Sequence, residues 1–214
     1  MITLTELNRT EALRYLGGAK VELNETMQQL LDECEPLVLE TAQPKYLYKE
    51  VDLRDETLLQ GDSIQNHLEG CEKAVLVCAT LGADVDRLIR VAGVTDMAKS
   101  VVLDSFASVA IEQVGHKLDD LLKTLYPDYY QTFRFSPGYG DYPITLQPYY
   151  LKLLDAPRKI GLSASASCML TPTKSITAIV GLSREPLKPG VRGCATCNLK
   201  ESCQIRKRGD HCGY

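Results

Sequence analysis

Four cysteines near the end of the chain have the spacing of a metal site. Cys194 and Cys197 form a Cys-x-x-Cys pair, and Cys203 and Cys212 follow within the last 21 residues. Two thiolates three positions apart fit one coordination sphere, and four cysteines can hold either zinc or a 4Fe–4S cluster. Few apolar residues surround them, so a bound metal would order a segment that has no core of its own. The alternative is a reduced tail without metal.

A second stretch suits the binding of a charged ligand. Residues 134–143 are Arg-Phe-Ser-Pro-Gly-Tyr-Gly-Asp-Tyr-Pro. The guanidinium of Arg134 is a planar fork of donors that matches a carboxylate. Gly138 and Gly140 let the backbone approach a ligand or adopt positive φ, and the prolines stiffen the loop, which lowers the entropy cost of holding a site open. On these residues alone, a rigid turn beside a surface arginine is the commoner explanation.

The elements around this loop are predicted to be mainly helical. The longest is a helix over 96–125, where apolar residues recur every three or four positions. Another is expected over 144–154, although Pro148 lies inside it. Further helices are expected from 8 to 17, from 24 to Pro36, over 62–68 and over 81–91, and strands over 46–51, 73–80, 162–167 and 175–181. This order indicates an α+β or mixed α/β fold over 1–183, with a Cys-rich tail over 184–214.

Composition narrows the class of protein. The chain has 214 residues and a formal net charge of −4, so it lacks the positive field that nucleic-acid binding requires. We expect no membrane span and no secretory signal, and therefore a cytoplasmic protein. Because the cytosol keeps thiols reduced, the four other cysteines are predicted to be small buried hydrophobes. They are Cys34, Cys71, Cys78 and Cys168.

The order of these features resembles the S-adenosylmethionine-binding activation domain of cobalamin-dependent methionine synthase. That family has a long helix, an acidic residue, Arg-x-x-Pro-Gly-Tyr, a helix, a glycine, a strand, Pro-x-Lys-Ser and a final strand. The matching stretches are 73–81, 103–112, 134–139 and 169–181, and the resemblance spans about residues 60 to 183. It implies an α+β fold, with a modest antiparallel-rich sheet flanked by helices, in a stand-alone form of the domain.

The resemblance also implies roles for residues of the loop. Arg134 would pair with the carboxylate of S-adenosylmethionine. Backbone groups at Ser136 and Gly138 would hold the adenine, and Tyr139 would lie near the sulfonium. An aromatic face suits a cationic methyl donor.

Two acidic residues complete the implied site. Asp128 would reach the ribose region, and Glu112 on the long helix would belong to the site. Each has a plainer explanation, because Asp128 could only shape the turn at Pro127, and Glu112 lies opposite the apolar stripe, near Asp119, where it could merely be solvated. His116, one turn beyond Glu112, is expected to be an ordinary surface histidine.

The sequence departs from the family pattern in three ways. Family members carry Leu-Thr-Glu-Ser before Pro-x-Lys-Ser, whereas residues 164–167 are Ala-Ser-Ala-Ser, so the acidic group is missing at Ala166. No residue matches the family's N-terminal aspartate, which receives the ligand's amino group. The domain fused to full-length synthase also lacks four such tail cysteines.

Two functions follow as hypotheses. In the first, the chain binds S-adenosylmethionine and supports reductive methylation of cob(II)alamin on a partner, a cobalamin-dependent methionine synthase or other corrinoid protein. A one-electron donor such as flavodoxin or ferredoxin would supply the electron, and this need favours the 4Fe–4S cluster over zinc. The chain lacks the Asp-x-His-x-x-Gly pattern of cobalamin-binding domains, so the corrin would be on the partner. In the second, it is a non-catalytic, metal-stabilised regulatory or interaction module for another corrinoid methyltransferase.

Overall fold

The computed structural model describes residues 2–17, 23–187 and 201. Its centre is a four-stranded, fully antiparallel sheet in the order β1-β2-β6-β3. The strands are β1 (Lys45–Val51), β2 (Lys73–Thr80), β6 (Ser175–Ser183) and the short β3 (Tyr130–Gln131). A second, two-stranded sheet pairs β4 (Ser163–Ala164) with β5 (Leu170–Thr171). The predicted α+β fold with a modest antiparallel-rich sheet is confirmed.

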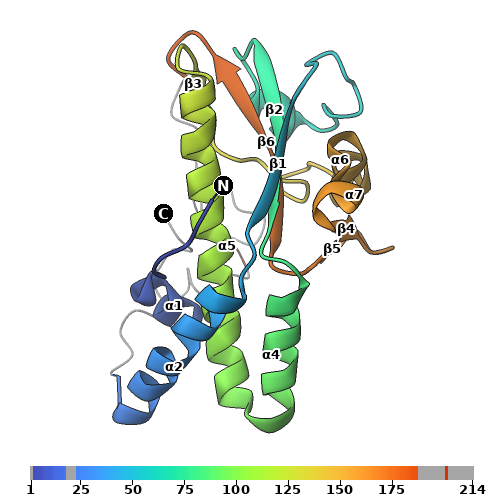
Figure 1. Cartoon of the computed structure of the whole chain (residues 1–214). Helices are drawn as coiled ribbons and strands as arrows, with labels where there is room; N and C mark the ends of the chain where they lie inside the picture. Colours follow the sequence, from blue (N-terminus) through green and yellow to red (C-terminus); the bar gives the residue numbers. More distant parts are fainter. Residues whose placement is uncertain (1, 18–22, 188–200, 202–214) are drawn as a thin grey trace.

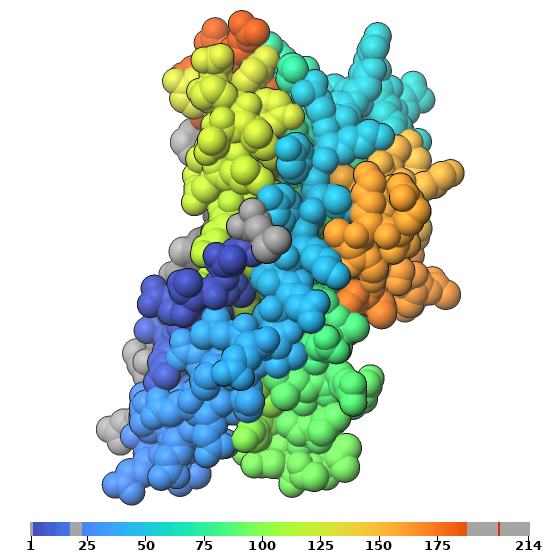
Figure 2. Space-filling model, in the orientation of Figure 1, coloured from blue at the N-terminus to red at the C-terminus, as the bar shows by residue number. Residues whose placement is uncertain are grey.

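Helices cover both faces of the sheet (Figure 1). One face carries α1 (Arg9–Tyr15), α2 (Glu25–Thr41), α4 (Ala83–Thr95) and α5 (Met97–Leu125). The other carries α3 (Asp62–His67), a 3₁₀ turn (Ile144–Leu146), α6 (Gln147–Leu154) and α7 (Ala156–Ile160). Figure 2 shows side chains filling the space between α6–α7, in orange, and β1, in blue. The molecule therefore has three layers.

Strand β2 separates two hydrophobic cores. Val75, Val77 and Ala79 pack with the helices around α5, whereas Leu76 and Cys78 pack with those around α6. Alternate side chains of a strand point to opposite faces, and a strand covered on both faces reads as a continuous apolar run. This explains the run over 73–80, which the sequence correctly predicted as a strand.

Helix α5 is the longest element and is the support for the site described below. It begins after Asp96, whose side chain accepts the Lys99 N–H at 3.0 Å and so satisfies one free donor of the first turn. The helix ends at Leu125, as predicted from its apolar period. Among the described residues, every helix is too short or too polar to cross a membrane.

Three expectations about the elements are wrong in detail. Pro36 does not end α2, which continues to Thr41 because its buried face continues through Val38; tertiary packing offsets the hydrogen bond that proline removes. The helix expected over 144–154 is a 3₁₀ turn followed by α6, and Pro148 lies in the first turn of α6, where no N–H partner is lost. The strand expected over 162–167 is only the two residues of β4.

The four scattered cysteines divide into two kinds. Cys34 and Cys78 are fully buried, as predicted. Cys71 and Cys168 are only partly buried, and Cys168 adopts the left-handed backbone conformation with φ of 63° in the turn between β4 and β5. Neither Cys71 nor Cys168 belongs to the two hydrophobic cores, so the prediction of buried hydrophobes is wrong for these two.

Candidate ligand site

The backbone of the loop places Arg134 on the α5 side of the sheet. Phe135 forms an antiparallel bridge with Ile179 of β6, with N···O distances of 2.9 and 2.8 Å in the two directions. The rings of Phe133 and Phe135 both pack in the core around α6. Because side chains alternate along an extended chain, Arg134 between them points to the opposite face, toward α5.

There, two carboxylates of α5 hold the guanidinium of Arg134. Its Nε donates to Asp119 Oδ2 at 3.1 Å, and its Nη2 donates to Glu112 Oε2 at 3.2 Å. Glu112 and Asp119 are seven positions apart, about two helical turns, and therefore lie on one face of α5. The Arg134 side chain is 12% exposed, against 28% for Asp119 and 42% for Glu112.

Burial and charge act in opposite directions on these groups. Burial lowers the pKa of the Arg134 guanidinium, but the carboxylates of Asp119 and Glu112 more than offset it and leave that pKa raised. Burial raises the pKa of Asp119, and Arg134 reverses only part of the rise. With both carboxylates ionised, the trio has a net charge of −1, which leaves negative charge for a cationic ligand group.

A small cavity of about 70 Å³ opens beside this trio. Small-molecule pockets usually have volumes of about 300–1,000 Å³, so this cavity can take one end of a nucleoside-sized ligand and not the whole of it. Eight residues line it: Glu112, His116, Asp119, Arg134, Ser136, Tyr139, Ile176 and Ala178. Tyr139 is half exposed, and its ring meets Phe135 edge-on with centroids 5.6 Å apart.

The rest of the loop is held in place by its own backbone and by α3. The Gly138 N–H donates to the Tyr142 carbonyl at 2.8 Å, and Gly138 has φ of 98°, a conformation that favours glycine. Asp141 accepts the backbone N–H groups of Asp62 and Ser63, at 2.7 and 2.9 Å, and so caps the start of α3. The loop is thus held at its first end by the bridge between Phe135 and β6, and at its other end by the contact between Asp141 and α3.

The structure brings together four of the six residues expected to bind the ligand. Glu112, Arg134, Ser136 and Tyr139 all line the cavity. Gly138 belongs to the same loop but does not line it.

Asp128 is exposed in the turn after α5, outside the cavity lining, and its charge is one of several that raise the pKa of Arg184. Ala166, where the family has an acidic residue, is also exposed and outside the lining.

Four cavity residues were not expected, two of them apolar, Ile176 and Ala178, and two polar, His116 and Asp119. His116 lines the cavity with its Nδ1 4.0 Å from Asp119 Oδ2, so it is not simply a surface histidine, although its side chain is 62% exposed. Asp119 was expected only as a neighbour of Glu112 on a solvated face. The signal for both was present, because positions 112, 116 and 119 follow the i, i+4, i+7 spacing of one helix face.

The predicted metal site lies outside the described residues, since Cys194, Cys197, Cys203 and Cys212 all fall in 188–200 or 202–214. Within the described ranges, no group of three or more His, Cys, Asp or Glu side chains is arranged to hold a metal ion. The metal at the tail cysteines stays a prediction.

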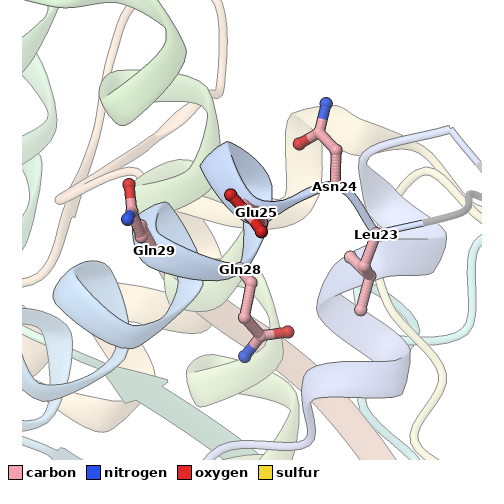
Figure 3. A pocket seen from close by; sticks show the side chains of 5 residues that line it. All are labelled: Leu23, Asn24, Glu25, Gln28 and Gln29. Carbon is pink, nitrogen blue, oxygen red and sulfur yellow. The ribbon is translucent and has the colours of Figure 1, made fainter.

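A second hollow, of about 390 Å³, lies at the start of α2 (Figure 3). Leu23, Asn24, Glu25, Gln28 and Gln29 line it. The Asn24 side chain already accepts the Met27 N–H at 2.8 Å as the cap of α2. The remaining amides and single carboxylate offer no chemistry comparable to the Arg134 cavity.

Comparison with known proteins supports the fold. A solved structure described as the MetH reactivation domain bound to AdoHcy superposes with a TM-score of 0.58, covering 94% of this chain and 74% of that one at 14% sequence identity. The chain therefore has the fold of the methionine synthase activation domain, as the resemblance implied. No protein-family model and no curated protein sequence matches the chain.

Proposed function

We propose that the chain binds S-adenosylmethionine in the Arg134 cavity and serves as the reactivation component of a cobalamin-dependent methionine synthase. The observation that carries this proposal is the meeting of Arg134, Glu112, Ser136 and Tyr139 at one cavity. The fold likeness adds support, because the solved neighbour holds AdoHcy, the product left when the methyl group has been transferred.

The charges of the cavity complement those of the methionine end of the ligand. Arg134 has five N–H donors, and its two ion pairs use two, which leaves three for a ligand carboxylate within the described contacts. The exposed part of Glu112 can accept the ligand's ammonium group. The face of Tyr139 can lie against the sulfonium.

The nucleoside end would lie outside the small cavity. Backbone groups of Ser136 and Gly138 are proposed to hold the adenine; because the Gly138 N–H already donates to Tyr142, its carbonyl is the group that remains. The ribose role of Asp128 requires a ligand extending from the cavity toward the turn after α5. The missing acid at Ala166 does not change the cavity lining.

The proposed reaction occurs on a partner that carries the corrin. One electron from flavodoxin or ferredoxin reduces cob(II)alamin, and the bond between sulfur and the methyl carbon of S-adenosylmethionine breaks as the methyl group passes to cobalt. S-adenosylhomocysteine is the product left in this chain. The role of this chain is to bind and orient the methyl donor, and a 4Fe–4S cluster or zinc at the tail cysteines would be an addition to it.

Titration calorimetry with S-adenosylmethionine tests the binding. We expect wild-type protein to bind and Arg134→Ala to weaken binding at least about tenfold, because a charge-assisted pair to the ligand is lost. Arg158→Ala is the matched control, since Arg158 is a 77% exposed arginine on α7 that pairs with Asp155. Equal affinity of wild type and Arg134→Ala would contradict the proposal.

A second experiment tests the reaction. A methionine synthase that lacks its own activation domain is held in the cob(II)alamin form and mixed with reduced flavodoxin, S-adenosylmethionine and this chain. We expect the absorption spectrum of methylcobalamin to appear only when the chain is present. Binding of S-adenosylmethionine without this conversion would favour the alternative, a regulatory module for another corrinoid methyltransferase.

A further inference from the structure

Gly115 occupies an unusual position on α5, directly beneath the guanidinium of Arg134. A β-carbon built on Gly115 would lie 2.2 Å from Arg134 Nη1, 2.6 Å from its Cζ and 2.9 Å from its Nη2. Non-bonded carbon and nitrogen atoms do not approach this closely. Gly115 is also buried and lies well inside a 29-residue helix.

Glycine at such a position opposes helix formation. A glycine inside a helix costs about 1 kcal/mol relative to alanine. Gly115 has an ordinary helical backbone, so no positive φ requires glycine there. The space taken by the arginine is the local feature that does require it.

The ion pairs show how the arginine uses that space. Glu112 lies one turn before Gly115 and Asp119 one turn after it, and the guanidinium bonds to both. It therefore rests on the bare backbone of α5, between its two carboxylate partners. A side chain at position 115 would push the guanidinium out of this position on α5.

We propose that Gly115 is a positioning residue, which sets the depth at which Arg134 meets the ligand's carboxylate, with Asp119 as the anchor that fixes its orientation. This inference rests on the proposed function. Gly115 touches no ligand atom itself; it acts only through the arginine.

The clash involves the far end of a flexible side chain and not backbone. Gly115→Ala should therefore fold, with Arg134 displaced, and its melting temperature should stay close to that of wild type, because the helix preference of alanine offsets the weakened ion pairs of Arg134. The displaced guanidinium would lose its alignment with the ligand's carboxylate.

The test uses the full chain and two ligands, S-adenosylmethionine and decarboxylated S-adenosylmethionine, which lacks only the carboxylate. Gly115→Ala should weaken binding of the first at least about tenfold and of the second by less than about twofold. A merely structural defect would weaken both alike. Gly93→Ala is the control, a glycine inside α4 whose added β-carbon would meet only Ser100, at 3.2 Å.

Asp119→Asn keeps the test valid if Gly115→Ala does not fold, because it preserves shape and removes the anchoring charge. As with Gly115→Ala, the affinity for S-adenosylmethionine should fall, whereas the affinity for the decarboxylated ligand should stay the same. Equal losses for both ligands in these variants, or none, would overturn this inference while leaving the proposed function intact. A wild-type protein that binds neither ligand would overturn both.

Discussion

Asp141 and Ser63 bond to each other in both directions. The Ser63 N–H donates to Asp141 Oδ1 at 2.9 Å, and the Asp141 N–H donates to Ser63 Oγ at 3.4 Å. This reciprocal contact joins the loop over residues 134–143 to the first turn of α3, since Asp141 and Ser63 are 78 positions apart in the sequence. The loop therefore depends for its shape on an element that does not line the cavity.

Asp141→Asn should make the protein less sensitive to acid. Hydrogen bonds from Ser63 hold the pKa of Asp141 below its usual value of 3.8. A depressed pKa in the folded state stabilises the fold above the unfolded value, and that contribution is lost as pH falls through the folded pKa. Between pH 5 and pH 2, urea unfolding should show a shallower loss of stability in the variant. An identical pH profile in wild type and variant would contradict the assignment.

Removing Arg134 should destabilise the protein most at neutral pH. Asp119 is partly buried and would lose its partner, so its already raised pKa would climb further. A raised folded pKa favours the fold at low pH, and that benefit is lost as pH rises through the folded pKa. We expect Arg134→Ala to lose about 1–2 kcal/mol at pH 7, and less at pH 5.

Thermal unfolding at the two pH values measures this loss, with His116→Gln introduced in every protein, since His116 lies 4.0 Å from Asp119. In the double variant Arg134→Ala with Asp119→Asn, the loss of stability should be the same at the two pH values. If the double variant keeps the full pH dependence, the buried Asp119 is not its cause.

Two buried tyrosines behind the loop should differ in their contributions to stability. The Tyr142 hydroxyl donates to the Leu58 carbonyl at 3.0 Å and lies 2.7 Å from the Tyr150 hydroxyl. Tyr142→Phe leaves both of those groups without this partner, at a cost of about 1–3 kcal/mol, whereas Tyr150→Phe removes a single bond, at about 1 kcal/mol. Urea unfolding should rank the variants in that order. The reverse order would contradict this prediction, because it would mean that the Tyr150 hydroxyl contributes more to stability than the Tyr142 hydroxyl.

The tail cysteines are predicted to hold a metal. Protein purified without oxygen should be brown, with iron–sulfur absorbance, if they hold a 4Fe–4S cluster, or colourless with one zinc per chain if they hold zinc. Replacing Cys194 and Cys197 with serine should abolish the signal, whereas replacing the buried Cys34 and Cys78 with alanine should not. Wild-type protein free of both metals would contradict the prediction.

Local patterns were enough to predict the long helix and the buried strand, because each is defined by the spacing of its own apolar residues. The apolar period fixed α5 to within one residue, and the continuous run over 73–80 matched β2. The end of α2 was missed because the packing of Val38 outweighs the local effect of Pro36.

The candidate site was only partly predictable, for a different reason. The motif identified Arg134, but its direction is fixed by the pairing of Phe135 with Ile179, a contact between distant segments. The partnership of Arg134 with Asp119 and the need for glycine at 115 both follow from that contact. Helical spacing places Glu112, His116 and Asp119 on one face, yet it does not say what faces them.

The alternation between Arg134 and Phe135 has a mechanical consequence. One side chain is fastened to α5 and its layer, while the next is embedded in the core around α6. Two adjacent residues thus connect the layers on opposite faces of the sheet at its edge. Separating α5 from this edge of the sheet would therefore require the ion pairs of Arg134 to break, while the bridge between Phe135 and Ile179 could stay in place.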